Sequence, residues 1–312
     1  MKIAEAPQQR AIVGGDFTQR LLFPSIGRVF IPRGKRDIWI GSVDRAGKML
    51  WVRQIGSDGE DRLRDLAVAK DGSLIVVGSF SGTLTLQSPQ GEQKKNSAGE
   101  IDGFVLRYNA QGELQWSLTV GGPGVDTANA VAIDSANLEV TLCGSFSGKA
   151  QFGSKISTSQ GGLDIFLLRL DINNAALSEM RAWGGIQDNE CQFLTLNAQD
   201  LPVMAGRSVG DMQVDNLQLS SKNQIGWIYT EQRAPIGTPS LQSIGITNQT
   251  QMDLRALAMD PKGNVYIAGN FKGTLILGQK TLQSSASESD AFWASLAPTG
   301  RWRWQVKAGG KA

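Results

Sequence analysis

The segment DGFVLRYNAQGELQWSLTVGGPGVDTANAVAIDSANLEVTLCGSF, residues 102–146, contains the unit from which the chain is built. Short apolar runs rich in Val, Leu and aromatic residues alternate with polar turns, a pattern that predicts β-strands. A turn at 110–112 separates the first two strands, and a Gly-Gly pair at 121–122 ends the second. Two further strands follow, on either side of Asn137. We therefore expect an all-β unit of antiparallel strands.

This unit recurs along the chain at a nearly constant spacing. A Gly-x-Phe sequence marks the end of one strand in four copies, beginning at Gly15, Gly78, Gly144 and Gly269, and Gly206 holds the same place in a fifth. Five repeats of about 62 residues then cover the whole sequence: 1–63, 64–129, 130–191, 192–254 and 255–312. Self-similarity at a fixed period is the signature of a repeat architecture. We expect one domain, residues 1–312, with four antiparallel strands in each repeat.

Several runs, such as LIVV at residues 74–77, are apolar at successive positions, which indicates strands covered on both faces. A lone four-stranded sheet cannot cover both of its own faces, whereas a ring of stacked sheets can. β-Propellers have about four to eight such blades. The sequence therefore predicts a five-bladed β-propeller. The long connection between the second and third strands of each repeat is expected to form a hairpin.

The repeat resembles the bacterial SBBP-type β-propeller repeat, and two groups of residues carry this resemblance. The first is Asp102, Phe104, Gly112, Trp116, Gly121 and Gly122; the second is Ala258, Asp260, Gly263, Asn264, Tyr266, Gly269 and Phe271. The resemblance implies a propeller, usually in secreted or surface bacterial proteins, and implies no particular activity. The fourth repeat departs from the pattern, with Ile225 where Asp is expected and Pro239 or Ser240 where Trp is expected.

Composition and charge exclude several classes of protein. The 31 basic and 29 acidic residues give a net charge of +2, and the basic loop around Arg33 has no interleaved aromatic residues. We therefore expect no nucleic-acid partner. No apolar run approaches the roughly 20 residues of a membrane-spanning helix, and the N-terminus has no signal-peptide core. Cys143 and Cys191 occupy different places in the repeat, which predicts free buried thiols.

The chain offers few groups for catalysis or metal binding. It has no histidine, which removes His-based triads, His general bases and His metal sites. No D-x-D-x-D-G loop supports a calcium site. The acids Asp37, Asp102, Asp164 and Asp290 recur just before a strand, where a carboxylate can accept backbone N–H bonds and fix a turn. We expect no enzyme activity, no catalytic residue, no metal and no cofactor.

The loops after the Gly-Gly pairs are the best candidates for binding, because in a propeller they ring the mouth of the central channel. Asp61, Asp126 and Asn189 each lie six residues before an equivalent first-strand position, and the loop that ends the fourth repeat adds Asn248, Gln249 and Asp253. Turn chemistry alone can explain such recurrence, and so can a ligand. The hypothesised binding residues are Asp61, Asp126, Asn189 and Asp253.

The leading hypothesis is a non-catalytic binding or scaffolding module that recognises a protein or a glycan through the loop face. We expect it outside the cytoplasm, at the cell surface, in the periplasm or secreted, as a monomer or as part of a larger surface protein. The alternatives are a carbohydrate-binding lectin and a glycoside-acting enzyme. The enzyme would need two carboxyl groups about 5 to 9.5 Å apart at a central funnel.

Overall fold

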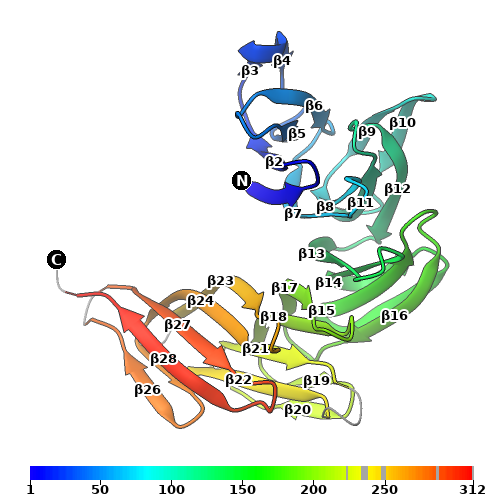
Figure 1. Cartoon of the computed structure of the whole chain (residues 1–312). Coiled ribbons are helices and arrows are strands. Elements are labelled where there is room, and N and C mark those ends of the chain that lie inside the picture. The colour runs from blue at the N-terminus through cyan, green and yellow to red at the C-terminus, as the bar shows by residue number, and fades with distance from the viewer. Residues whose placement is uncertain (223, 233–237, 247–250, 286–287, 311–312) are drawn as a thin grey trace. The chain divides into compact units, whose positions relative to one another are not determined.

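In a computed structural model of the chain, the structure describes residues 1–222, 224–232, 238–246, 251–285 and 288–310. Almost all regular structure in these ranges is β-strand (Figure 1). The helical structure in the same ranges is a single 3-10 turn, η1 (Pro24–Ile26). The all-β prediction is therefore confirmed. No helix in the described ranges is long and apolar enough to cross a membrane.

Each predicted repeat forms four strands that are hydrogen-bonded in chain order. The first contains β1 (Lys2–Ala6), β2 (Arg10–Phe17), β5 (Asp37–Val43) and β6 (Met49–Ile55), and the second contains β7 (Arg62–Val68), β8 (Leu74–Phe80), β11 (Asp102–Tyr108) and β12 (Leu114–Gly121). The third contains β13 (Thr127–Ile133), β14 (Glu139–Phe152), β15 (Lys155–Asp171) and β16 (Leu177–Trp183). The fourth contains β17 (Asn189–Leu196), β18 (Pro202–Val209), β21 (Gln224–Thr230) and β22 (Ser240–Ile246), and the fifth contains β23 (Gln251–Met259), β24 (Val265–Lys272), β27 (Asp290–Leu296) and β28 (Trp302–Ala308).

The long connections inside the repeats form hairpins, as predicted. Four are separate strand pairs: β3 (Leu21–Phe23) with β4 (Arg28–Phe30), β9 (Thr83–Ser88) with β10 (Gly91–Asn96), β19 (Met212–Val214) with β20 (Leu217–Leu219), and β25 (Thr274–Leu277) with β26 (Lys280–Gln283). In the third repeat, β14 and β15 extend into the connection without a break. These hairpins bring variable side chains to the end of the sheet where the Gly-Gly loops also lie.

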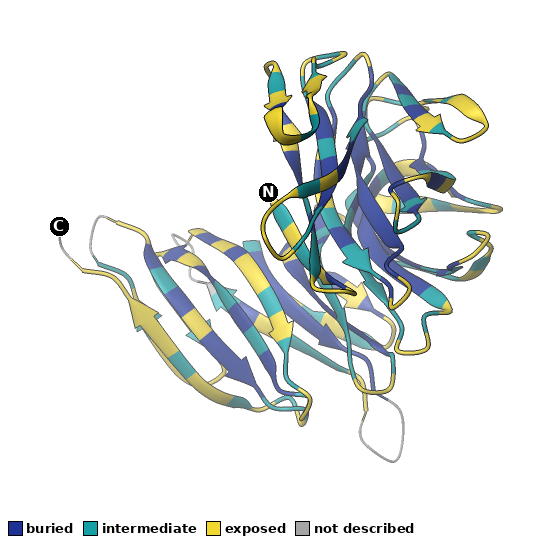
Figure 2. Ribbon diagram, turned by 45° about the horizontal axis from the view of Figure 1, so that its top comes forward, coloured by how far each residue is buried: buried dark blue, intermediate teal, exposed yellow. Residues whose placement is uncertain are grey.

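The chain divides into two compact units, residues 1–159 with 166–181 and residues 160–165 with 182–312. A core in the first unit joins the first two repeats and includes Ile12, Val76 and Phe104. A core in the second unit joins the last two repeats and includes Ile228 and Phe292. The strands contributing to these cores are largely buried (Figure 2). Successive apolar residues thus bury both faces of the strands, as the sequence predicts. The arrangement of the five sheets around one axis stays a prediction.

Tryptophans in the fourth strands connect one repeat to the next. The indole Nε1 of Trp51 donates to the carbonyl oxygen of Ala110 at 3.0 Å, and Nε1 of Trp116 donates to that of Ile172 at 2.9 Å. Gly112 lies under the Trp51 ring with φ of 72°, and a Cβ there would approach the ring to 2.6 Å. Trp51 is buried and Trp116 is half-buried, so both tryptophans pack between repeats.

The prediction that the two cysteines are free is wrong. Cys143 and Cys191 are both buried and both disulfide-bonded. Repeat position alone therefore cannot predict the state of a cysteine.

Candidate binding site at the third Gly-Gly loop

Two of the predicted site residues close the loops at residues 56–61 and 121–126, which with the loop at 184–189 we call the first, second and third Gly-Gly loops, although the first begins with Gly-Ser. Asp61 and Asp126 are fully buried. The Oδ2 atom of Asp61 accepts a hydrogen bond from the backbone N–H of Ser57 at 2.7 Å. Asp126 accepts from the backbone N–H groups of Gly122 at 2.8 Å and Ser147 at 3.2 Å. Each carboxylate therefore fixes the shape of its own loop.

Asn189, the equivalent residue in the third loop, is also fully buried. Its Nδ2 donates to the carbonyl oxygen of Gln187 at 2.7 Å, and its Oδ1 accepts from the hydroxyl of Ser208. The amide group can donate to a carbonyl oxygen, which an ionised carboxylate cannot do. Asn189 thus holds the backbone at Gln187 where the acids of the first two loops hold N–H groups.

Asp253 lies one register position further along than the other three. It pairs with Asn270, whereas the preceding Met252 pairs with Phe271 and is buried. The Asp253 side chain is exposed, and its Oδ2 lies 2.6 Å from Nη2 of Arg255. The hydrogen bond with Glu190 raises the pKa of Arg207, and the negative charge of Asp253 adds to this shift. Asn248 and Gln249 of the same loop lie outside the described residues.

The acids at the start of the third strands accept backbone hydrogen bonds, as predicted. The N–H groups of Arg33, Ala98, Gln160 and Ser285 donate to Asp37, Asp102, Asp164 and Asp290, respectively. Asp102 faces the loop acid Asp126: a Cβ added at Gly121 would lie 2.9 Å from both Asp102 Oδ1 and Asp126 Oδ2. The fourth repeat has Ile225 in place of this acid, and the loop after it has Met252. The third-strand position and the loop position are therefore both polar in the first three repeats and both apolar in the fourth.

Burial makes the side chains of Asp61 and Asp126 weaker acids than an ordinary aspartate. Desolvation raises the pKa of Asp61 to about 7, and the neighbouring Asp37 charge adds to this shift. Desolvation raises the pKa of Asp126 to about 6, with a contribution from Asp102. In the described part of the chain, one buried oxygen each of Asp61, Asp102 and Asp164 has no hydrogen-bond partner. An unpaired buried oxygen disfavours the carboxylate and favours the protonated acid.

A serine hydroxyl seals each of the first two loops against the next repeat. Ser81 Oγ accepts from the backbone N–H of Glu60 at 2.9 Å, and Ser147 Oγ accepts from that of Val125 at 2.8 Å. A glycine makes this approach possible, because a Cβ at Gly59 or Gly124 would lie 2.3 Å from the hydroxyl oxygen. The Gly and Ser pair therefore leaves no room between loop and sheet.

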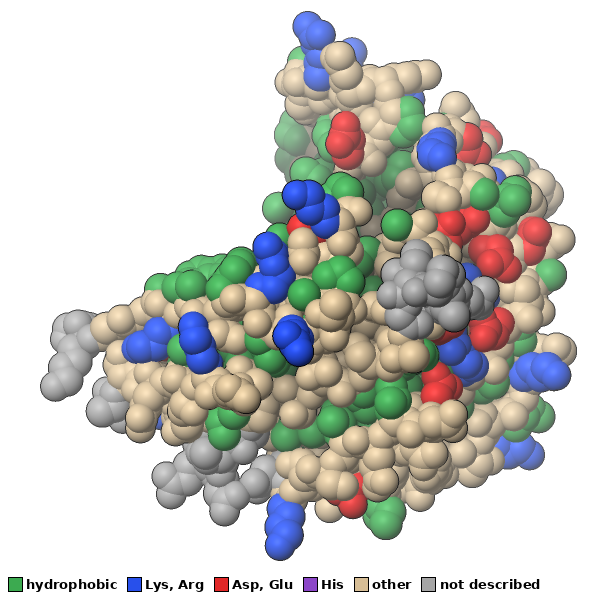
Figure 3. Space-filling model, turned by 60° about the horizontal axis from the view of Figure 1, so that its bottom comes forward, with side chains coloured by type: hydrophobic (Ala, Val, Ile, Leu, Met, Phe, Trp, Pro, Cys, Tyr) green, Lys and Arg blue, Asp and Glu red, His purple; other side chains and the backbone are tan. Residues whose placement is uncertain are grey.

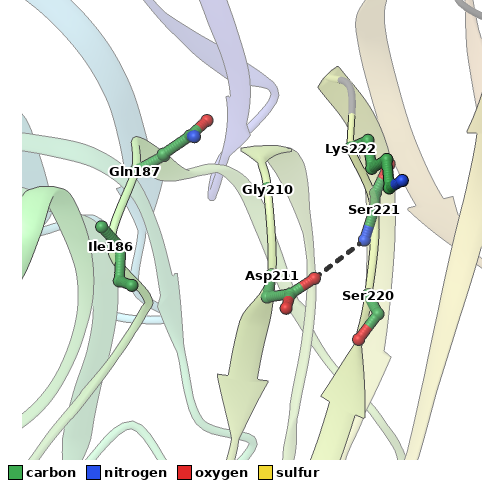
Figure 4. A pocket seen from close by; sticks show the side chains of 7 residues that line it. All are labelled: Ile186, Gln187, Gly210, Asp211, Ser220, Ser221 and Lys222. Carbon is green, nitrogen blue, oxygen red and sulfur yellow. Dashed lines mark hydrogen bonds between the residues drawn. The ribbon is translucent and has the colours of Figure 1, made fainter.

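The third loop lacks both members of this pair. Gln187 stands where the first two loops have glycine, and Val209 stands where they have serine. The loop is instead held by a backbone hydrogen bond from Val209 N–H to the carbonyl oxygen of Asp188, at 2.8 Å. A cavity of about 720 Å³ opens beside it, which we call the loop cleft, lined by Ile186, Gln187, Gly210, Asp211, Ser220, Ser221 and Lys222 (Figure 4).

Two segments form the walls of the loop cleft. The Gly-Gly loop supplies Ile186 and Gln187, and residues at the base of the β19–β20 hairpin supply Asp211, Ser221 and Lys222. The backbone N–H of Ser221 donates to Asp211 Oδ1 at 3.1 Å, which joins the two ends of the hairpin. Ile186 is 85% exposed.

The lining combines one carboxylate, one ammonium group, one amide, two hydroxyls and one exposed apolar side chain. Such a set can bind a chain that carries alternating hydrogen-bond donors and acceptors. Sequence reasoning missed these residues because it searched for features shared by all repeats. The signal that could have found them is the loss of the repeated Gly and Ser at 187 and 209.

Comparisons with known proteins reach only part of the chain or have low similarity. No family model matches the sequence. Over 135 residues the chain is 35% identical to the regulatory protein FlaEY of Caulobacter vibrioides, a match covering 43% of this chain and 14% of that protein. The chain therefore spans about a seventh of the matched relative's length. The resemblance to the SBBP-type repeat stays a prediction.

Solved structures with some likeness include propeller-type dehydrogenases. A quinohemoprotein alcohol dehydrogenase from Pseudomonas putida matches with a TM-score of 0.43 and 10% identity, over 96% of this chain and 52% of that one. A europium-containing methanol dehydrogenase matches with a TM-score of 0.40 and 12% identity, over 92% and 61% of the two chains. At this level of similarity, the activity of these enzymes says nothing about this chain.

Proposed function

We propose that this chain is a non-catalytic binding module that holds an extended segment of a partner protein in the loop cleft. The observation that carries this proposal is the opening of one loop among equivalent ones. Glycine and a serine hydroxyl seal the first two loops, and Gln187 and Val209 replace them in the third. The first two loops share one sealed arrangement, so the change at both of these positions supports the third loop as the recognition site.

The lining of the loop cleft favours a protein segment over a glycan. A peptide main chain offers N–H and C=O groups to the Gln187 amide, the Asp211 carboxylate and the serine hydroxyls. The exposed Ile186 side chain supplies an apolar anchor for one side chain of the partner. The lining residues include no aromatic ring on which a sugar ring could stack.

The same lining argues against the glycoside-acting alternative. Hydrolysis of a glycosidic bond uses two carboxyl groups on opposite sides of that bond. The loop cleft has one carboxylate, Asp211, and it already accepts a hydrogen bond from Ser221. Binding without turnover is therefore the function that these residues support best. The FlaEY relative, a regulatory protein by name, is compatible with such a role.

We assign the predicted site residues supporting roles in and beside their own loops. Asn189 positions the backbone of Gln187, and Asp61 and Asp126 shape the equivalent loops. Asp253 contributes to a charged rim: its charge helps to raise the pKa of Arg207, which forms an ion pair with its strand partner Glu190. These roles are indirect, through loop shape and surface charge.

We further propose that the five sheets are blades of a propeller and that the protein works outside the cytoplasm. The repeat pattern and the four-stranded sheets support the first statement. The disulfide-bonded cysteines support the second, because disulfides persist in oxidising compartments and are rare in the cytosol.

The test is a screen of the whole chain against a randomised peptide library and a glycan array in parallel. We expect peptides to be enriched, and Asp211→Ala and Ile186→Ser to weaken their binding tenfold or more. Asp71→Ala and Lys262→Ala, in the short turns between first and second strands, serve as controls. Enrichment of glycans alone, or weaker binding only in the control variants, would overturn the proposal.

A further inference from the structure

Two acids of the second repeat are buried together at the base of the second Gly-Gly loop. Asp102 begins β11 and Asp126 ends the loop, and these residues are 3% and 0% exposed. Because a Cβ at Gly121 would lie 2.9 Å from Asp102 Oδ1 and from Asp126 Oδ2, these two oxygens flank the same point. Acidic side chains at the surface, red in Figure 3, have their charge solvated by water. The buried pair has no such solvation.

The Asp102 oxygen that faces this point has no hydrogen-bond partner among the described residues. Asp102 Oδ2 accepts from the backbone N–H of Ala98 at 2.9 Å, whereas Oδ1 is buried and unpaired. Asp126 Oδ2 accepts from the backbone N–H of Gly122 at 2.8 Å. A carboxylate oxygen has two lone pairs, so both facing oxygens can accept a further ligand. Two buried negative charges without a positive partner are strongly unfavourable.

In two other repeats a side chain of the fourth strand pairs with the third-strand acid. The residue opposite the third-strand aromatic is Gln54 in the first repeat and Lys307 in the fifth. Gln54 Nε2 donates to Asp37 Oδ2 at 2.6 Å, and Lys307 Nζ donates to Asp290 Oδ2 at 2.7 Å. In the fifth repeat an ammonium group therefore occupies the place beside the acid.

The second repeat has lost this donor. Thr119 lies opposite the third-strand aromatic there, so it holds the position of Gln54 and Lys307. Its side chain is shorter than either, and Asp102 Oδ1 is left unpaired.

The second repeat also lacks the positive charge that lies near the first pair. Burial raises the pKa of Asp61, and the positive charge of Arg33 opposes this shift. Ala98 takes the place of Arg33 in the second repeat, since the backbone N–H of each donates to the third-strand acid. Burial raises the pKa of both Asp102 and Asp126, and the groups that oppose these shifts are backbone N–H groups.

The third repeat has only one of the two acids. Asp164 also has an unpaired buried oxygen, but the neutral amide of Asn189 stands at the loop position. In the ranges that the structure describes, only the second repeat thus combines two buried carboxyl groups with no positive side chain.

We infer that Asp102 and Asp126 bind a calcium ion between Asp102 Oδ1 and Asp126 Oδ2. The ion takes the place that the Lys307 ammonium group has in the fifth repeat, and its two charges balance two carboxylates. The sequence predicts no metal because a D-x-D-x-D-G motif places its ligands in one loop, whereas these ligands come from a strand and a later loop. The inference does not depend on peptide binding in the loop cleft.

The ligands and the packing favour Ca²⁺ over Mg²⁺. Both ions prefer oxygen ligands, but Mg²⁺ usually keeps several waters. The base of the loop is tightly packed, since a Cβ at Gly122 would lie 1.9 Å from the carbonyl oxygen of Lys149. The described residues bring no third Asp, Glu, Cys or His side chain to the site. We therefore expect weak binding, with a Kd of about 10⁻⁴ to 10⁻³ M, as in extracellular calcium modules.

The experiment is thermal denaturation of the whole chain at pH 8 and constant ionic strength, with Ca²⁺ raised from zero to about 10 mM. An ion that binds only the folded state raises the Tm as its concentration rises. We expect the Tm of the wild type to rise with Ca²⁺, and to rise less with Mg²⁺. Equilibrium dialysis should find a single bound Ca²⁺ per chain.

Three variants make the result specific. Thr119→Lys supplies the ammonium group that Lys307 supplies in the fifth repeat, so it should fold stably without Ca²⁺ and bind Ca²⁺ at least tenfold more weakly. Asp126→Asn removes one carboxylate and should also weaken binding tenfold or more. Asp164→Asn changes the single acid of the third repeat and serves as the control, with Ca²⁺ binding unchanged.

A wild type that binds no Ca²⁺ at pH 8 would overturn the inference and leave protons as the means of neutralising the pair. Binding of equal strength in the wild type, Thr119→Lys and Asp126→Asn would also overturn it, because the ion would then lie elsewhere.

Discussion

At the scale of single residues, the buried acids of the Gly-Gly loops fix the shape of their loops through hydrogen bonds, and burial raises their pKa values. Their recurrence in the sequence predicts a role in binding or in turn formation, but it does not predict that the side chains are buried. Spacing alone cannot distinguish a side chain that faces solvent from one that folds back onto its own loop. Ser57 and Gly122 show the second arrangement, with N–H groups directed at the carboxylates of Asp61 and Asp126. The acids at the start of the third strands were predictable, because a turn that needs an acceptor is a local feature.

The raised pKa of Asp61 predicts that the protein loses stability as the pH rises. An unfolded aspartate has a pKa of about 3.9. The folded value is about 7, so the folded state holds the proton more tightly. The stabilising contribution is complete below the unfolded pKa and is lost as the pH rises toward 7. Chemical denaturation at pH 5 and pH 8 should therefore show lower stability at pH 8.

Asp61→Asn provides the control for this pH effect. The amide cannot ionise, so the variant should lose a large part of the difference in unfolding free energy between pH 5 and pH 8. Asp126, with its pKa raised to about 6, contributes to the remaining dependence, as do Asp65, Asp102 and Asp164, whose pKa values burial also raises. A variant with the same pH dependence as the wild type would show that Asp61 is ionised in the folded protein.

Phe104→Ala should destabilise the protein by about 3 to 5 kcal/mol, the usual cost of truncating a buried aromatic side chain. Phe104 is fully buried, and its ring lies so close to Gly78 that a Cβ there would approach it to 2.6 Å. Urea denaturation monitored by circular dichroism measures the change. The same experiment on Trp116→Ala tests the half-buried tryptophan, and a loss below 1 kcal/mol in both variants would contradict the packing described here.

At the scale of elements, the contact between the Trp51 strand and the next repeat depends on a glycine turn. Gly112 and Gly47 have nearly the same positive φ, but only Gly112 lies beneath an indole ring. Replacing either by alanine costs about 1 to 2 kcal/mol for the left-handed backbone. Gly112→Ala must in addition push the Trp51 ring away, so its free energy of unfolding in urea should fall clearly more than that of Gly47→Ala. Equal losses would mean that the Trp51 ring yields without cost.

Strands and turns were predictable from the sequence because each depends on local periodicity, and the hairpins followed from the alternation inside the long connections. The opening of the third loop was not predicted. It depends on two residues far apart in the chain, Gln187 and Val209, and their meaning appears only when Ser81 and Ser147 are seen to seal the first two loops. Long-range pairs of this kind carry no local signal.

At the scale of the whole molecule, the repeat count and the four-stranded sheets follow from self-similarity, while the state of the cysteines does not. Cys143 and Cys191 are both disulfide-bonded, although their places in the repeat do not predict it. Cys143→Ser should lower the free energy of unfolding by about 2 to 4 kcal/mol, the typical contribution of a disulfide. Denaturation of the wild type with and without a reducing agent checks this expectation. Identical curves would show that the bond contributes nothing to stability.

The most direct test of the central claim is to close the loop cleft from the side of the Gly-Gly loop while keeping the wall that the hairpin supplies. The double variant Gln187→Gly and Val209→Ser restores the residues that seal the first two loops, while Asp211, Lys222 and the β19–β20 hairpin stay unchanged. Peptides selected from a randomised library on the wild-type chain should bind this variant at least tenfold more weakly, while its thermal stability is unchanged or higher. Binding of equal strength to both proteins would contradict the assignment of the loop cleft as the recognition site.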